Sequence, residues 1–195
     1  MNKSDFEKQI EFILEIDKVK NILRRTHTTS GKNENDAEHS WHMSIMIFLL
    51  SEYSNEKFDV LKAIKMALIH DLVEIDAGDT YAYDSVNIAT QSEREDKAAK
   101  RIFSMLPDKN KKEFTELFYE FEAKITPEAK FVRAIDNFQP ILLNDFNKGN
   151  DWRINGVTKE QIYNRNKITS ESTDVIWEKI KEIIDENIKN GNIKE

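Results

Sequence analysis

The stretch MALIHDLVEIDAGDT, at residues 66–80, decides how the rest of the chain is interpreted. Between residues 60 and 77, 12 of 18 positions are apolar, which predicts a helix that is buried on most of its surface. His70 and Asp71 lie at its centre. Burying two such polar side chains without partners would cost several kcal/mol. The sequence therefore requires either a bound metal ion or a closed hydrogen-bond network around this pair.

The composition is that of a globular chain, and it narrows the class of partner. The 195 residues suit one domain with a sizeable core, which we place at residues 1–195. The formal net charge is −7 and no basic block stands out, which argues against a nucleic-acid polymer as partner. A phosphorylated small molecule is compatible with this charge, because a bound metal ion supplies positive charge locally.

The sequence also bears on the cellular compartment. Cysteine is absent, which excludes disulfides and thiolate metal ligands and fits a reducing compartment. The first residues, MNKSDFEKQIEF, are charged and helical in pattern, which is not the pattern of a signal peptide. No run approaches the roughly 20 apolar residues that a membrane span needs. We therefore predict a cytoplasmic protein that does not cross a membrane.

Apolar residues recur at helical spacing along most of the chain, and only five Gly and three Pro interrupt it. We therefore predict an all-α fold. Asp36 is the expected N-cap of the second helix, and Gly78 marks the end of the third. Thr126 followed by Pro127 marks a later helix start. The predicted helices occupy residues 6–23, 37–54, 58–77, 93–106, 114–121, 127–149, 159–168 and 172–190, with loops at 26–35 and 79–92.

The chain has four histidines, at positions 27, 39, 42 and 70. His39 lies in the second predicted helix, the pair His70-Asp71 in the third, and Asp136 in a later apolar helix. Imidazole nitrogens and carboxylate oxygens together suit divalent ions such as Mn, Fe, Co, Ni or Zn. Each of these residues alone is more often a hydrogen-bonded core group, and Asp136 alone would pair with Arg133. The order H…HD…D, with every member on a predicted helix, favours one shared metal site.

Three segments carry a family resemblance: ENDAEHSWH at 34–42, IHDLVEIDAGDT at 69–80 and AIDNFQP at 134–140. Together they resemble the HD-domain metal-dependent phosphohydrolases, and within these the 5'-deoxynucleotidase branch. The resemblance covers the chain from Arg24 to Trp152. It implies an HD-domain helical bundle that holds one divalent metal ion, which can be Mn, Co, Fe, Ni, Zn or Mg. The ligands that it implies are His39, His70, Asp71 and Asp136.

The resemblance also implies roles for residues around the metal. Glu74 would orient or activate water, and Asp79 would position the attacking water or protonate the leaving group. Arg24 would hold the substrate phosphate. Glu38 matches a family glutamate, but its place in a first helical turn also fits an acid that stabilises the helix dipole.

Three positions are less well defined. His42 fits a core or supporting residue better than a ligand, and His27 is equally compatible with a substrate contact and with exposure to solvent. The well-known deoxynucleotidases carry Arg-Trp where this chain has Arg24-Arg25. In that branch the Trp is associated with excluding ribose, so Arg25 leaves the base and sugar preference open.

The activity that the resemblance implies is metal-dependent hydrolysis of nucleoside 5'-monophosphates, deoxynucleoside ones included, to nucleoside and phosphate. Family members of this kind are commonly homodimers, so we also expect a homodimer. Two alternatives stay open. One is hydrolysis of another phosphorylated nucleotide, either a diphosphate or a cyclic phosphodiester, and the other is a non-catalytic domain that binds metal and senses nucleotide. A two-metal site would need more ligands than the motif and two spare histidines supply.

Overall fold

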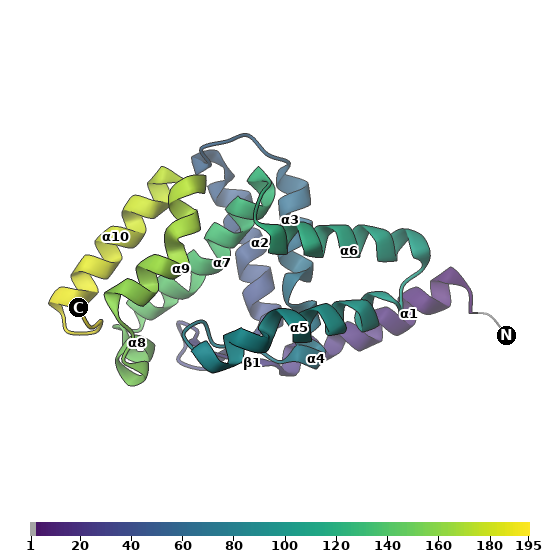
Figure 1. The fold of residues 1–195 in the computed structure, drawn as a ribbon, viewed down its shortest axis with the longest axis horizontal. Coiled ribbons are helices and arrows are strands. Elements are labelled where there is room, and N and C mark those ends of the chain that lie inside the picture. Colours follow the sequence, from purple (N-terminus) through teal and green to yellow (C-terminus); the bar gives the residue numbers. More distant parts are fainter. Residues whose placement is uncertain (1–2) are drawn as a thin grey trace.

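The computed structural model describes residues 3–195 and consists almost entirely of helices (Figure 1), as the sequence predicts. The α-helices are α1 (Asp5–Ile16), α2 (Asp36–Leu50), α3 (Val60–Ile69), α4 (Glu74–Ala77), α5 (Ser85–Phe103), α6 (Asp108–Ala123), α7 (Pro127–Phe146), α8 (Asn150–Asn155), α9 (Lys159–Ser172) and α10 (Asp174–Lys189). The described residues also form the short 3₁₀ helices η1 (Asp17–Asn21), η2 (Ser51–Tyr53) and η3 (His70–Val73), and the strands β1 (Leu23–His27) and β2 (Asn33–Asn35). None of the helices in residues 3–195 combines the length and the hydropathy that crossing a bilayer requires.

Helix α7 is the centre of the packing. It contacts α2, α3, α6, α9 and α10, and in Figure 1 it lies between α2 and α9. Its start is encoded locally, because the Thr126 side chain accepts a hydrogen bond from the Ala129 backbone N–H (3.3 Å) and Pro127 occupies the first turn. Its buried face carries Asp136 and Gln139 among apolar residues. Helix α7 therefore brings polar groups into the core.

A short antiparallel hairpin, β1–β2, occupies a part of the chain that was expected to be helix and loop. The predictions of helix as far as residue 23 and of an irregular loop at 26–35 are wrong. Backbone hydrogen bonds from Thr28 N–H to Lys32 O (2.8 Å) and from Gly31 N–H to Thr28 O (2.9 Å) close the turn. Gly31 adopts a φ of +85°, which glycine tolerates because it has no Cβ. Strands this short show no alternating pattern, so periodicity could not reveal them.

The buried stretch that decides the fold is divided at its polar pair. Helix α3 ends at Ile69, η3 winds through His70 and Asp71, and α4 begins at Glu74. The prediction of one continuous helix is therefore wrong, although Gly78 (φ +73°) ends the segment as predicted. The tighter 3₁₀ winding changes the direction of successive side chains. Both members of the pair are buried, as the sequence predicts.

Helix α5 begins earlier than predicted, at Ser85 rather than near residue 93. Asp84 caps it, because its carboxylate accepts hydrogen bonds from the backbone N–H groups of Val86 and Asn87 (3.2 Å each). The first turns of this helix are largely exposed, so no apolar period marks them. Helix α6 also begins earlier than expected, at Asp108 rather than near residue 114, and the short helix α8 was not predicted. Helices α9 and α10 lie close to the expected ranges.

The N-cap of α2 is Asn35 and not Asp36. Asn35 Oδ1 accepts a hydrogen bond from the Glu38 backbone N–H (3.0 Å), and the Glu38 carboxylate accepts one from the Asn35 N–H (3.2 Å). This reciprocal capping box satisfies two backbone donors. Glu38 thus stabilises the start of the helix that carries His39, and Asp36 is the first helical residue and is fully buried.

Replacing Asn35 with Ala should destabilise the protein by about 1 kcal/mol, because the cap bond to the Glu38 N–H is lost. Asn35→Asp keeps an oxygen acceptor and serves as the matched control. Urea unfolding followed by circular dichroism measures the difference in the free energy of unfolding. Equal stability of the Ala variant and the parent protein would contradict the capping role.

Candidate metal centre

The 3₁₀ turn η3 fixes the ring of His70. Its Nδ1 lies 2.8 Å from the carbonyl oxygen of Ala67. A carbonyl oxygen can only accept, so Nδ1 carries a proton, and in the neutral imidazole Nε2 is the nitrogen that offers a lone pair. Nε2 is buried and makes no hydrogen bond within residues 3–195, although it lies 3.0 Å from Asp71 Oδ1 and 3.9 Å from Asp136 Oδ1. An unprotonated, buried imidazole nitrogen that faces carboxylates is suited to binding a metal ion.

His39 and Asp136 approach the same point from α2 and α7. His39 Nε2 lies 3.1 Å from Asp136 Oδ1 and 4.0 Å from Asp71 Oδ2. His39, His70 and Asp136 offer ligand atoms that all lie within 4.8 Å of one another. The fold thus brings together all four residues that the sequence suggested as ligands, with Asp71 beside the other three.

This set of donors fits a divalent metal ion, because imidazole nitrogens and carboxylates are its usual protein ligands. Burial by itself would raise the pKa of Asp136. The hydrogen bond with His39 and the charge of Arg133 outweigh burial and hold this pKa well below its usual range. Arg133 Nη1 donates to Asp136 Oδ2 (2.9 Å). The carboxylate is therefore charged, as a metal ligand must be, and its Oδ1 is directed to the imidazoles.

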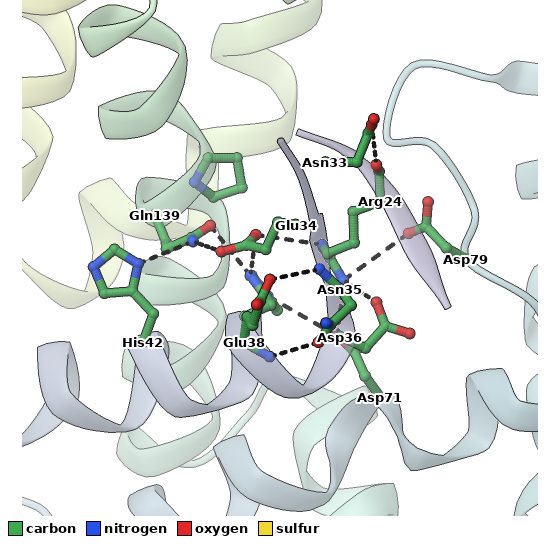
Figure 2. Close-up of polar contacts among 12 residues, drawn as sticks. Arg24, Asn33, Glu34, Asn35, Asp36, Glu38, His42, Asp71, Asp79 and Gln139 are labelled. Atoms are coloured by element: carbon green, nitrogen blue, oxygen red, sulfur yellow. Dashed lines mark hydrogen bonds and ion pairs between the residues drawn. The ribbon is translucent and has the colours of Figure 1, made fainter. Parts of the chain in front are cut away.

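A layer of polar side chains, Glu34, Gln139 and His42, lies on the side of His39 that faces away from the other predicted ligands. Figure 2 shows these three side chains next to one another. The Nδ1 atom of His39 lies 3.1 Å from Gln139 Oε1 and 3.5 Å from Glu34 Oε2. Gln139 Nε2 donates to Glu34 Oε1 (2.6 Å) and lies 3.1 Å from His42 Nδ1. The Gln139 amide is therefore oriented with its oxygen toward His39, so Nδ1 is the donor and Nε2 is left for the metal. His42 contacts this layer, which agrees with its expected supporting place.

Arg24 lies among carboxylates and not at an exposed helix end. Its Nη1 donates to Asp71 Oδ2 (2.9 Å) and to Asp36 Oδ1 (3.3 Å), and it lies 3.9 Å from Asp79 Oδ1. Figure 2 shows the guanidinium reaching from the hairpin toward these acids. Arg24 therefore compensates the charge of Asp71, a role beyond the phosphate contact that the resemblance implies.

Asp36, Asp71 and Glu74 form a second group of converging carboxylate oxygens. Arg24 already donates to two of them, so this group has a positive charge at hand without a second metal ion. Burial and the neighbouring Asp71 raise the pKa of Asp36 to about 7. The number of metal ions, predicted to be one, stays a prediction.

Glu74 and Asp79 line a cavity of about 350 Å³ whose wall includes three of the four predicted ligands. Burial and the carboxylates of Asp71 and Asp36 raise the pKa of Glu74 well above its usual range. Burial also raises the pKa of Asp79, against the opposing charge of Arg24. Both carboxyl groups are therefore able to hold a proton that a surface acid would lose.

The order and convergence of these residues agree with a known family. The sequence model of the HD-domain family matches residues 16–177, a span that contains every predicted ligand. The chain belongs to the HD-domain family.

Several known proteins are similar to this HD-domain chain. A crystal structure from Magnetospirillum magnetotacticum, described as a predicted metal-dependent phosphohydrolase, is 40% identical with a TM-score of 0.93, over 98% of this chain and 97% of that one. Human 5'-deoxynucleotidase HDDC2 is 27% identical over 135 residues, which make up 68% of this chain and 65% of the human protein. The 5'-deoxynucleotidase hdd1 of Schizosaccharomyces pombe is 34% identical over 114 residues, 56% of each chain. The matched region thus spans just under two thirds of the human relative.

A second cavity of this HD domain adjoins the first at Arg24 and Asp79. Arg25 lines it and stacks over Tyr81, with the guanidinium carbon 4.5 Å from the ring centre. Nearby, His27 Nδ1 lies 2.8 Å from Asp151 Oδ1. His27 thus pairs with Asp151, a residue that lines this cavity.

Several residues of the site were not identified from the sequence. Gln139 lies three positions after Asp136, and this spacing puts both on one side of α7, so a signal was present. Arg133 was identified only as a partner that Asp136 would have in the absence of a metal ion, and the structure shows this ion pair within the site. Glu34 offered none, because it falls in a segment that was expected to be a loop. Asp36 was identified only as a cap.

Replacing Gln139 with Met should weaken metal binding roughly ten- to a hundredfold, the usual effect of removing a group that orients a metal-binding histidine. Met keeps the volume but loses all three polar contacts, with His39, Glu34 and His42. Isothermal titration calorimetry with Mn²⁺ measures the affinity. His42→Ala is the matched control, since it removes a neighbour of Gln139 without touching His39. Unchanged affinity in the Met variant would show that Gln139 does not orient His39.

Metal binding should also depend on pH through His39. Burial and the charge of Arg24 disfavour its charged form, but the carboxylates of Asp136 and Glu34 outweigh them and raise its pKa to about 9. A metal ion must therefore displace a proton from His39 below that pH, so its affinity should rise by up to about tenfold per pH unit. Calorimetry in buffers of different ionisation enthalpy, from about pH 6.5 to 8.5, measures both affinity and proton release. A flat profile without proton release would refute this.

Proposed function

We propose that this HD-domain protein is a metal-dependent phosphohydrolase that converts nucleoside 5'-monophosphates, deoxynucleoside ones included, to nucleoside and phosphate. The observation that carries the proposal is the convergence of His39, His70, Asp71 and Asp136 beside an acid-lined cavity, with the Nε2 of His70 free of hydrogen bonds within residues 3–195. The similarity to relatives named 5'-deoxynucleotidase supports the substrate class.

In this proposal the four residues hold one divalent ion. When bound, such an ion lowers the pKa of a water molecule and offsets negative charge on the phosphoryl group. Glu74 lines only the metal cavity among the described cavities, so we assign it to the attacking water. The positive charge of a bound metal ion would favour the ionised form of Glu74, and in that form its carboxylate would accept a proton from the water. Asp79 lines both cavities and has a raised pKa, so we assign it to protonate the leaving oxygen between phosphate and nucleoside.

The second cavity is the proposed nucleoside site. Arg25 and Tyr81 form one of its walls, and aromatic and guanidinium faces suit stacking against a base. We assign the preference for base and sugar to this wall of the cavity. Arg25 occupies the position at which the well-known deoxynucleotidases carry Trp. Arg24 as a phosphate contact, a homodimer and a cytoplasmic location stay predictions.

A phosphate-release screen tests the function. Purified protein is incubated with ribo- and deoxynucleoside 5'-monophosphates in the presence of Mn, Co, Mg, Zn or Fe. We expect release with at least one metal, and loss of both metal binding and release in Asp71→Ala, because a ligand is removed. Asp76→Ala removes an exposed carboxylate five positions away and is the matched control. Full activity of a metal-free Asp71→Ala protein would rule the proposal out.

A further inference from the structure

Arg165 lies where the cavities of the molecule meet. This half-buried residue of α9 lines the metal cavity, the proposed nucleoside cavity and a third, open groove along α9. Its charge also reaches the catalytic region, since it is among the positive charges that oppose the burial-driven rise in the pKa of Asp79. No sequence motif pointed to Arg165, which lies outside the three family segments.

The four basic residues that line the metal cavity are not equivalent. Arg24 donates to Asp71, and Arg133 donates to Asp136 and to Glu122 (2.7 Å). Both guanidinium groups are therefore engaged by acids. Within residues 3–195, by contrast, the side chains of Arg165 and Lys124 make no hydrogen bond and no ion pair with another residue.

A phosphate monoester brings about two negative charges into a cavity that already holds six acids. A cation that is already paired with carboxylates contributes less to the binding of a phosphate monoester than an unpaired cation does. A guanidinium offers parallel N–H donors that match two phosphate oxygens. Arg165 has both properties, and its position between the two cavities is where a 5'-phosphate would join its nucleoside.

We propose that Arg165 binds the phosphate group of the substrate, with Lys124 adding a second positive charge on the same side of the metal cavity. This inference rests on the proposed function for the identity of the substrate. It identifies α9, a helix outside the H…HD…D motif, as the element that supplies the unpaired charge for the phosphate.

Calorimetric titration of the Mn²⁺-loaded protein with inorganic phosphate tests the inference without requiring turnover. Arg165→Gln should weaken phosphate binding roughly ten- to a hundredfold, as expected for lost charge-assisted hydrogen bonds, and Arg165→Lys should retain part of the affinity. The KM for a nucleoside 5'-monophosphate should rise by a similar factor. Affinity for the free nucleoside and the metal content should stay unchanged.

Lys167→Gln is the matched control, because it removes an exposed charge from the same helix and lines only the third groove among these cavities. Equal phosphate affinity in Arg165→Gln and Lys167→Gln would overturn the inference, as would an equal loss of nucleoside affinity, which would assign Arg165 to the nucleoside. Absence of phosphate binding by the parent protein would also overturn it. Failure of the proposed function is distinct: phosphate would bind through Arg165, but no nucleotide would be hydrolysed.

Discussion

Two arginine–aspartate pairs allow the metal ligands to be buried. Arg24 donates to Asp71 Oδ2 and Arg133 donates to Asp136 Oδ2, each at 2.9 Å. In both acids the other oxygen, Oδ1, faces an imidazole, at 3.0 Å from His70 Nε2 and 3.1 Å from His39 Nε2. A buried carboxylate without a partner would be protonated, which would remove it as a ligand. The facing histidines and the arginines together hold the pKa of both acids below its usual range despite burial, and the arginines leave one oxygen of each acid directed toward the site.

This constraint accounts for parts of the fold that lie outside the motif. The hairpin supplies two of the polar residues of the site. Its strand β1 carries Arg24, and its strand β2 carries Glu34, which belongs to the polar layer behind His39. The capping box at Asn35 then starts α2 directly after the hairpin, so that His39 follows within its first turns. The strand β1, the cap at Asn35 and the ligand His39 together form this side of the site. Of these, only His39 belongs to the H…HD…D pattern.

The two arginine–aspartate pairs distinguish Arg24 and Arg133 from the other basic residues that line the metal cavity. Arg24 and Arg133 each donate a hydrogen bond to an acid that is a predicted metal ligand, so these acids largely neutralise their positive charge. In the proposed phosphate site, additional positive charge comes from Arg165 of α9, a helix that packs against α7. Helix α9 therefore both packs on the core and lines these cavities.

The accuracy of the sequence predictions followed the range of the interactions involved. The start of α7 at Thr126 was predictable, because a cap depends on residues three positions apart. The hairpin and the 3₁₀ turn at His70 were not, because a three-residue strand has no period and a change of helix type leaves the apolar pattern intact. The early start of α5 was missed for a related reason, since exposed turns need no apolar period.

By itself, the sequence determined the helical class, the buried setting of His70-Asp71 and the set of acids and imidazoles available to a metal. Only the tertiary structure decided which side chains orient these acids and imidazoles through hydrogen bonds and ion pairs. His39 and Asp136 are 97 residues apart in the chain, and the partners Arg24, Glu34 and Gln139 come from three different elements. The packing of distant segments determines which oxygen of an acid faces a histidine and which arginine remains unpaired. The spacing of residues along the chain does not predict that packing.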